Sequence, residues 1–124
     1  MAGELILIIE DNEKNRKLAR DVLQAKGYAT LEAETGEEGV RLARERRPAL
    51  VLMDIQLPGI DGITALGQLR ADAATRAIPV IAVTASAMTQ DRQKIMAAGF
   101  DGYQSKPIRL QEFLRAVRAM LDRA

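Results

Sequence analysis

The stretch LVLMDIQLPGIDG, residues 50–62, places an acidic residue directly after four apolar ones. The four apolar residues are typical of a strand that is buried on both of its faces. Asp54 ends this run, and Pro58 and Gly59 then turn the chain. Two interpretations of Asp54 are open from the residues alone. It is either a hydrogen-bonded carboxylate that serves the following loop, or a group that faces a cleft and takes part in chemistry.

Composition excludes several functional classes. The chain has 124 residues, 48% of them hydrophobic, which suits one domain with a single core. Its 18 basic and 17 acidic residues give a net charge of +1, which argues against nucleic-acid binding. The chain has no Cys and no His, so Cys/His dyads, Ser-His-Asp triads and ordinary zinc sites are excluded. Any metal ion is therefore expected to be a hard cation on oxygen ligands.

Nothing in the sequence indicates a membrane or secreted protein. No apolar run approaches the roughly 18 residues of a membrane span. The first residues lack the basic region of a secretory signal. No repeat, low-complexity segment or linker interrupts the chain, so we expect residues 1–124 to form one domain of a cytoplasmic protein without membrane insertion.

Outward from residues 50–62, the chain alternates between strand-like apolar runs and helix-like apolar periods. The expected strands are residues 5–9, 28–33, 49–53, 79–83 and, more weakly, 101–105. The expected helices are residues 13–26, 37–46, 63–71, 88–98 and 110–121. Continuous apolar strands that alternate with helices are typical of a parallel sheet between two helix layers. The sequence thus predicts an α/β fold, a doubly wound five-stranded parallel sheet of the (βα)5 type.

Two of the expected helices have a clear apolar stripe. In helix 13–26 the positions expected to face inward are Leu18, Ala19, Val22 and Leu23. In helix 110–121 they are Leu110, Phe113, Leu114, Val117, Met120 and Leu121. Gly67 lies inside helix 63–71, where glycine is less favourable than alanine by about 1 kcal/mol.

Polar side chains follow the expected strands, at the edge where a doubly wound sheet binds its ligands. Glu10 and Asp11 follow the first strand, Asp54 the third, Thr84 the fourth and Lys106 the fifth. In a sheet of order 2-1-3-4-5 the first and third strands are neighbours. We therefore expect the three carboxylates to share one pocket.

Each residue also has a purely structural explanation. Asp11 or Asn12 fits the cap of the first helix, Thr84 is more often a cap than a ligand contact, and a lone Lys106 is usually solvated. Their combination points to chemistry, because carboxylates about 4 Å apart repel by roughly 1 kcal/mol per pair in water and up to about 4 kcal/mol at an effective dielectric of about 20. A hard divalent cation reverses this repulsion, with Mg2+ preferred and Mn2+ as the alternative. A carboxylate beside it can form an acyl phosphate.

Four motifs resemble those of the response-regulator receiver domain of the CheY-like superfamily, the phosphorylatable module of two-component signalling, with a flavodoxin-like fold. They are LIIEDNEKN with Glu10 and Asp11, LVLMDIQLPGIDG with Asp54, PVIAVTASA with Thr84, and AGFDGYQSKPI with Tyr103, Lys106 and Pro107. The resemblance covers nearly the whole chain. EDNEKN, TASAM and GYQSKPI are most similar to the stand-alone cell-cycle receivers of the DivK type and to receivers fused to hybrid histidine kinases.

The resemblance implies a role for each residue of the phosphorylation site. Asp54 resembles the phospho-acceptor, and Lys106 the lysine that pairs with the phosphoryl group. Thr84 is similar to the switch hydroxyl that moves toward that group, and Tyr103 to the switch aromatic whose rotamer follows it. The peptide bond between Lys106 and Pro107 matches one that is cis in this family.

The resemblance also implies the metal ligands. Asp11 and Asp54 would bind Mg2+ directly, together with the backbone carbonyl of Gln56, while Glu10 would hold metal-bound water. Glu10 replaces the commoner Asp, which makes the metal shell one methylene different. Gln56 and Ser86 occupy positions that influence how long the phosphoryl group survives, and neither is acidic.

The function that the resemblance implies is a phosphorylation switch rather than a conventional enzyme. A histidine kinase or phosphotransfer protein would phosphorylate Asp54. The face formed by the fourth helix, fifth strand and fifth helix would then change shape to regulate a partner protein. A single-domain regulator is expected because the sequence starts with Met1 and ends at Ala124, with a receiver cut from a larger hybrid kinase or multidomain regulator as the alternative.

Three other classes are disfavoured by the residues. A phosphohydrolase with an aspartyl nucleophile would have a second acid at the position of Gln56. An unphosphorylated interaction module would have lost Asp54, Asp11 or Lys106. A nucleotide- or flavin-binding protein would carry a glycine-rich phosphate-binding pattern after the first strand, and none is present.

Overall fold

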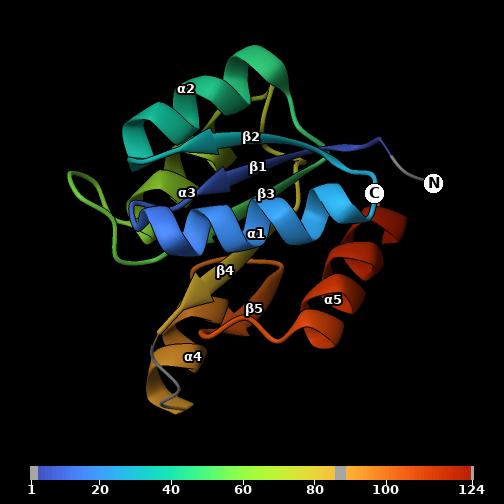
Figure 1. The fold of residues 1–124 in the computed structure, drawn as a ribbon. Coiled ribbons are helices and arrows are strands. Elements are labelled where there is room, and N and C mark those ends of the chain that lie inside the picture. The colour runs from blue at the N-terminus through green and yellow to red at the C-terminus, as the bar shows by residue number, and fades with distance from the viewer. Residues whose placement is uncertain (1–2, 86–88, 124) are drawn as a thin grey trace.

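The structure is a computed structural model that describes residues 3–85 and 89–123. Its sheet has five parallel strands, β1 (Leu5–Ile9), β2 (Ala29–Ala33), β3 (Leu50–Asp54), β4 (Val80–Thr84) and β5 (Gly102–Ser105). They alternate with α1 (Glu13–Ala25), α2 (Gly36–Arg46), α3 (Gly62–Ala71), α4 (Thr89–Ala97) and α5 (Leu110–Arg123) (Figure 1). The order across the sheet is β2-β1-β3-β4-β5, which confirms the predicted fold class.

The sheet separates two apolar layers. On one side, α1 and α5 bury Leu23, Phe113 and Val117 against the strands. On the other side, α2, α3 and α4 contribute residues such as Val40 and Leu66. All five residues of β3 and of β4 are buried, as the continuous apolar runs predict for central strands. The central strands are therefore held from both faces, and their carboxyl ends are rigidly placed.

Local sequence explains where the helices begin and end. Asn12 caps α1 by accepting a hydrogen bond from the backbone N–H of Asn15 at 3.0 Å, so the cap is Asn12 rather than Asp11. Asp61 caps α3 in the same way, through the N–H of Thr64 at 2.8 Å. Gly27, with φ of 90°, follows the end of α1 in the left-handed conformation that glycine favours.

The predicted apolar stripes are wrong at two positions. Leu18 is 44% exposed and Leu110 is 52% exposed. On α1, Ala19 and Leu23 are the buried residues, and Leu18 faces a groove at the side of the helix. Leu110 is the first residue of α5 and lies beyond the layer that Phe113 enters. The helical period therefore does not decide whether a residue at the side or at the end of an apolar stripe is buried.

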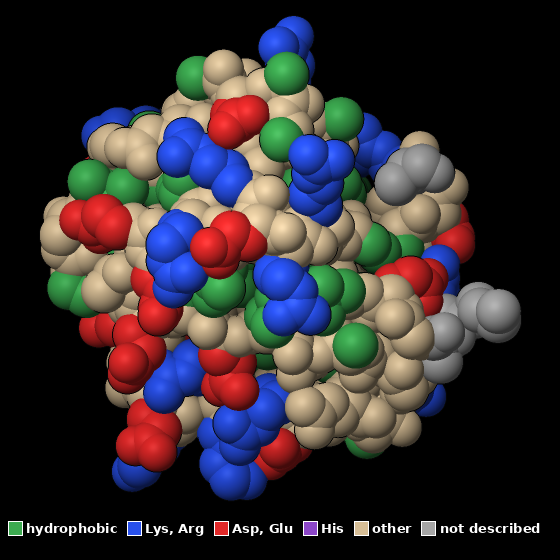
Figure 2. All heavy atoms as spheres, turned by 90° about the horizontal axis from the view of Figure 1, so that it is seen from above, with side chains coloured by type: hydrophobic (Ala, Val, Ile, Leu, Met, Phe, Trp, Pro, Cys, Tyr) green, Lys and Arg blue, Asp and Glu red, His purple; other side chains and the backbone are tan. Residues whose placement is uncertain are grey.

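The surface matches the balanced composition. Figure 2 shows the molecule from above relative to Figure 1. On this face, basic and acidic side chains are interspersed and do not form separate positive and negative patches. Ion pairs of α2 contribute to this pattern, including Arg41 with Glu45 at 2.9 Å and Arg44 with Asp72 at 2.9 Å. Among the residues that the structure describes, no helix combines the length and apolar character needed to cross a membrane.

Candidate functional site

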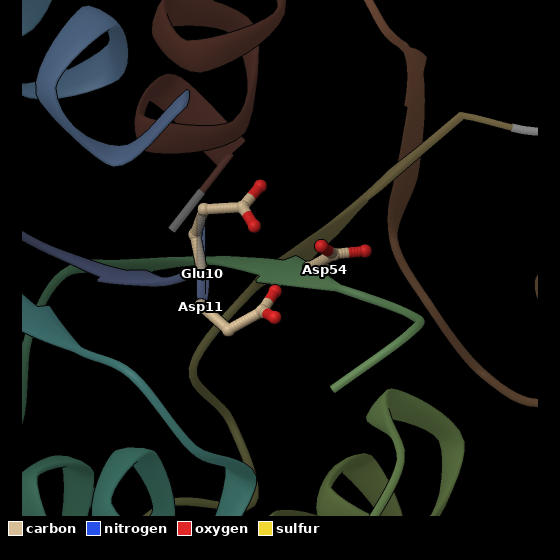
Figure 3. A group of neighbouring side chains, drawn as sticks. All are labelled: Glu10, Asp11 and Asp54. Carbon is tan, nitrogen blue, oxygen red and sulfur yellow. The ribbon is translucent and has the colours of Figure 1, made fainter. Parts of the chain in front are cut away.

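Three carboxylates meet at the carboxyl edge of the sheet. Ile9 of β1 pairs with Met53 of β3, and this register places the next residues, Glu10 and Asp54, side by side. Together with Asp11, these residues offer carboxylate oxygens that all lie within 4.8 Å of one another. Figure 3 shows the three side chains reaching from the ends of β1 and β3 toward the same region. The predicted pocket is therefore present in the fold.

Burial makes this cluster unfavourable without a counter-charge. Glu10 and Asp54 are each 5% exposed, whereas Asp11 is exposed. Like charges that are removed from water repel more strongly than charges at the surface. The cluster thus requires positive charge for stability.

Lys106 supplies one positive charge. Its Nζ atom donates to Asp54 Oδ2 at 2.9 Å and lies 2.6 Å from Glu10 Oε1. The residue directly follows β5, and its backbone N–H donates to the carbonyl of Thr84 at 2.7 Å. The peptide bond between Lys106 and Pro107 is cis. A single ammonium group does not neutralise three carboxylates.

Backbone N–H groups complete the hydrogen bonding of the two buried carboxylates. Asp54 Oδ1 accepts from the N–H of Gln56 at 3.1 Å, while Oδ2 accepts from Lys106. Glu10 Oε2 accepts from the N–H of Asn12 at 3.1 Å. Both carboxylates are therefore fixed in orientation by groups of the chain itself.

The titration of the site reflects burial first and the neighbouring charges second. Burial raises the pKa of Glu10 to about 7, and neighbouring Asp54 acts in the same direction, while the hydrogen bond from Lys106 opposes them. Burial alone lowers the pKa of Lys106, but the two carboxylates outweigh it and leave that pKa raised. Lys106 thus remains an ammonium group, and Glu10 readily takes up a proton in the absence of another cation.

The donor set fits a hard divalent cation. Its ligand atoms are carboxylate oxygens from Glu10, Asp11 and Asp54, within 4.8 Å of one another. Mg2+ prefers oxygen ligands and typically takes one or two carboxylates, with water completing its shell. The backbone carbonyl of Gln56 stays a predicted ligand.

Of the other predicted residues, Thr84 lies at this edge and Tyr103 lies within β5. Thr84 ends β4 and is 3% exposed, one residue beyond Val83, which pairs with Asp54. Tyr103 of β5 is half-buried, and the guanidinium carbon of Arg92 lies 5.4 Å from the centre of its ring. Ser86 and the expected start of the fourth helix at Met88 lie outside the described residues.

Sequence reasoning missed Arg16 at this site. Its Nη1 atom donates to the backbone carbonyl of Glu10 at 2.9 Å. Arg16 lies near the N-terminus of α1, where the helix dipole disfavours a cation. The mismatch is not specific to Arg16, because Lys14 and Lys17 place basic side chains in the same part of the helix.

Comparison with known proteins identifies relatives of this chain in sequence and in fold. The family profile "Response regulator receiver domain" matches residues 6–118. The polar-differentiation response regulator DivK of Brucella anthropi is 46% identical over 119 residues, which cover 96% of this chain and 97% of the relative. DivK of Brucella ovis is 45% identical over 119 residues, with the same coverage.

Two solved structures are similar in fold. The receiver domain of a sensor histidine kinase from Pseudomonas aeruginosa, crystallised with a magnesium ion coordinated in the active-site cleft, has a TM-score of 0.91 at 35% identity, over 98% of this chain and 99% of that one. A putative response regulator from Chloroflexus aurantiacus has a TM-score of 0.93 at 28% identity, over 97% of this chain and 98% of that one.

The parallel sheet with an acidic cluster and a lysine at its carboxyl edge defines a CheY-like signalling module. The chain belongs to the response regulator receiver domain family of two-component signalling.

Proposed function

We propose that this chain, as one receiver domain over residues 1–124, is a phosphorylation-dependent switch that accepts a phosphoryl group on Asp54. The observation that carries the proposal is the placement of the Lys106 ammonium 2.9 Å from Asp54 Oδ2 and 2.6 Å from Glu10 Oε1. A buried carboxylate beside an ammonium group is suited to bind and transfer a phosphoryl group.

The proposed step is a transfer from phosphohistidine. A carboxylate oxygen of Asp54 attacks phosphorus, the P–N bond breaks with its electron pair going to the imidazole, and an acyl phosphate forms. Lys106 offsets charge on the phosphoryl oxygens, because its Nζ already lies at Asp54 Oδ2. Asp11, Asp54 and the Gln56 carbonyl, with Glu10 through water, would hold Mg2+, which supplies further charge neutralisation when bound.

The proposed readout runs through Thr84 and Tyr103. After phosphorylation the Thr84 hydroxyl moves toward the phosphoryl group, and Tyr103 turns inward. Burial of Thr84 at the end of β4, next to β3, supports this coupling. The face of α4, β5 and α5 then changes shape for a downstream protein. Differential contacts of a few kcal/mol are sufficient to shift such a two-state equilibrium.

The proposed donor is a histidine kinase or a phosphotransfer protein that docks beside Asp54. A groove runs from Asp54 to α1 and the start of α5, and Leu18, Pro107 and Ile108 line it. The exposed Leu18 offers apolar contact at this groove. The DivK relatives, which have nearly the same length, support a single-domain regulator. The similar receiver from a sensor histidine kinase supports the alternative, a domain of a larger protein.

Incubation with Mg2+ and a small phosphodonor, followed by intact mass measurement, tests the proposal. Wild type is expected to gain one phosphoryl increment, and Asp54→Asn none. An equal increment in both proteins, or no increment in wild type, would show that the assignment of Asp54 is wrong.

A further inference from the structure

Arg16 of α1 connects three segments beside the acidic cluster. Its Nη1 atom donates to the carbonyl of Glu10 at 2.9 Å and lies 3.5 Å from the carbonyl of Asp11. Its Nε donates to Glu32 Oε1 of β2 at 3.2 Å, and its Nη2 lies 3.7 Å from Glu34 Oε1. The side chain is only 14% exposed.

The chemistry of guanidinium makes these contacts restrictive. Its donors lie in one plane, so simultaneous contacts from Nη1, Nε and Nη2 fix both the position and the rotation of the group. Arg16 thereby links the turn after β1 to Glu32 in β2 and to Glu34 after it.

The turn that Arg16 holds carries two of the three carboxylates. Glu10 and Asp11 supply both the carbonyls that face Arg16 and the side chains of the acidic cluster. A residue's backbone conformation determines where its side chain points. The loss of Arg16 would therefore free the turn whose geometry brings these carboxylates to Asp54.

We propose that Arg16 is a positioning residue for the divalent cation site, acting on Glu10 and Asp11 through their backbone carbonyls. The inference rests on the proposed function in one respect, that the acidic cluster binds Mg2+. Its role would be indirect, because the contacts of Arg16 are with backbone carbonyls and with Glu32 and Glu34.

The direction in which Mg2+ affinity changes when Arg16 is removed distinguishes a positioning role from a simple effect of its charge. A positive charge near a cation site repels the cation, so the removal of Arg16 would tighten Mg2+ binding if charge were its whole contribution. A positioning role predicts the opposite, because disordered ligands bind more weakly. Residues that orient metal ligands typically contribute about 10- to 100-fold to affinity.

Arg20 offers a matched control. It lies one turn further along α1 and pairs with the same Glu32, from Nη1 to Oε2 at 3.1 Å, and with Asp21. Arg20→Met thus removes an arginine charge and a Glu32 ion pair while leaving the contacts between Arg16 and the Glu10 turn in place.

The experiment measures the Mg2+ dissociation constant of the full chain by titration calorimetry, in wild type, Arg16→Met, Arg16→Lys and Arg20→Met. We expect binding about 10- to 100-fold weaker in Arg16→Met, an intermediate loss in Arg16→Lys, which keeps the charge, and a change below about twofold in Arg20→Met. Arg16→Lys keeps the test decisive if Arg16→Met does not fold.

Three outcomes overturn the inference. The first is binding in the Arg16 variants as tight as in wild type, or tighter. The second is an equal loss in Arg20→Met. The third is a wild-type protein that binds no Mg2+, which overturns the metal part of the proposed function as well. The first two outcomes leave the proposed function standing.

Discussion

Lys106 Nζ lies 2.9 Å from Asp54 Oδ2, although β4 separates the strands that carry the two residues. The same ammonium group also contacts Glu10 after β1. One cation thus joins three strand ends at the edge where the order of the sheet changes direction. This arrangement offsets part of the negative charge of the acidic cluster.

Removal of this cation should destabilise the metal-free protein. Lys106→Met leaves Glu10 and Asp54 buried without their ion-pair partner. Loss of one member of a buried ion pair typically lowers the free energy of unfolding by about 3–5 kcal/mol. Denaturant unfolding in chelator at alkaline pH measures it, and an unchanged midpoint would contradict the described charge balance.

Removal of a carboxylate should have the opposite effect. Asp11→Ala relieves like-charge repulsion, so we expect the metal-free protein to gain up to about 1 kcal/mol of unfolding free energy, since Asp11 is exposed and screened. The same variant should lose most of the stabilisation that Mg2+ gives wild type. A lower melting temperature in chelator would count against a crowded pocket.

The pH dependence of stability should follow Glu10. Its pKa is raised from 4.5 to about 7 in the folded chain, so the folded state binds this proton more tightly than the unfolded state does. The resulting stabilisation is complete below pH 4.5 and disappears as the pH rises through about 7. Unfolding in chelator across this range should show the loss in wild type and much less of it in Glu10→Gln. Parallel curves for the two proteins would refute the raised pKa.

A substitution far from the site provides an independent check of the fold. Gly67 lies within α3 and is exposed, and apart from its chain neighbours and the nearby backbone of α3 no atom comes within 4 Å of the position that a Cβ would occupy. Gly67→Ala should therefore stabilise the chain by about 1 kcal/mol through helix propensity, without changing Mg2+ binding. Destabilisation would mean that α3 is not helical at this position.

The sequence predicted those features that depend on local pattern. The buried character of β3 and β4 follows from their apolar runs, and the parallel sheet follows from the alternation of such runs with helices. The carboxylate cluster followed from the expected strand order, because Glu10 follows β1 and Asp54 ends the neighbouring β3. These features need no knowledge of side-chain packing.

Features that depend on tertiary packing could not be predicted from the local sequence pattern. Leu18 is exposed because it lines an open groove between α1 and the start of α5, which the helical period does not encode. The contact of Arg16 with the Glu10 carbonyl depends on the distance between α1 and the turn before it. The sequence does not distinguish Asp11 from Asn12 as the cap of α1, since both side chains can accept a backbone hydrogen bond.

The most direct test of the central claim is to locate the phosphoryl group. After reaction with Mg2+ and a phosphodonor, borohydride reduction converts an acyl phosphate into an alcohol, and peptide mass spectrometry then identifies the reduced residue. We expect wild type to be reduced at Asp54, and this reduction to be lost when the phosphodonor is omitted. Reduction at another carboxylate, or at none, would contradict the claim.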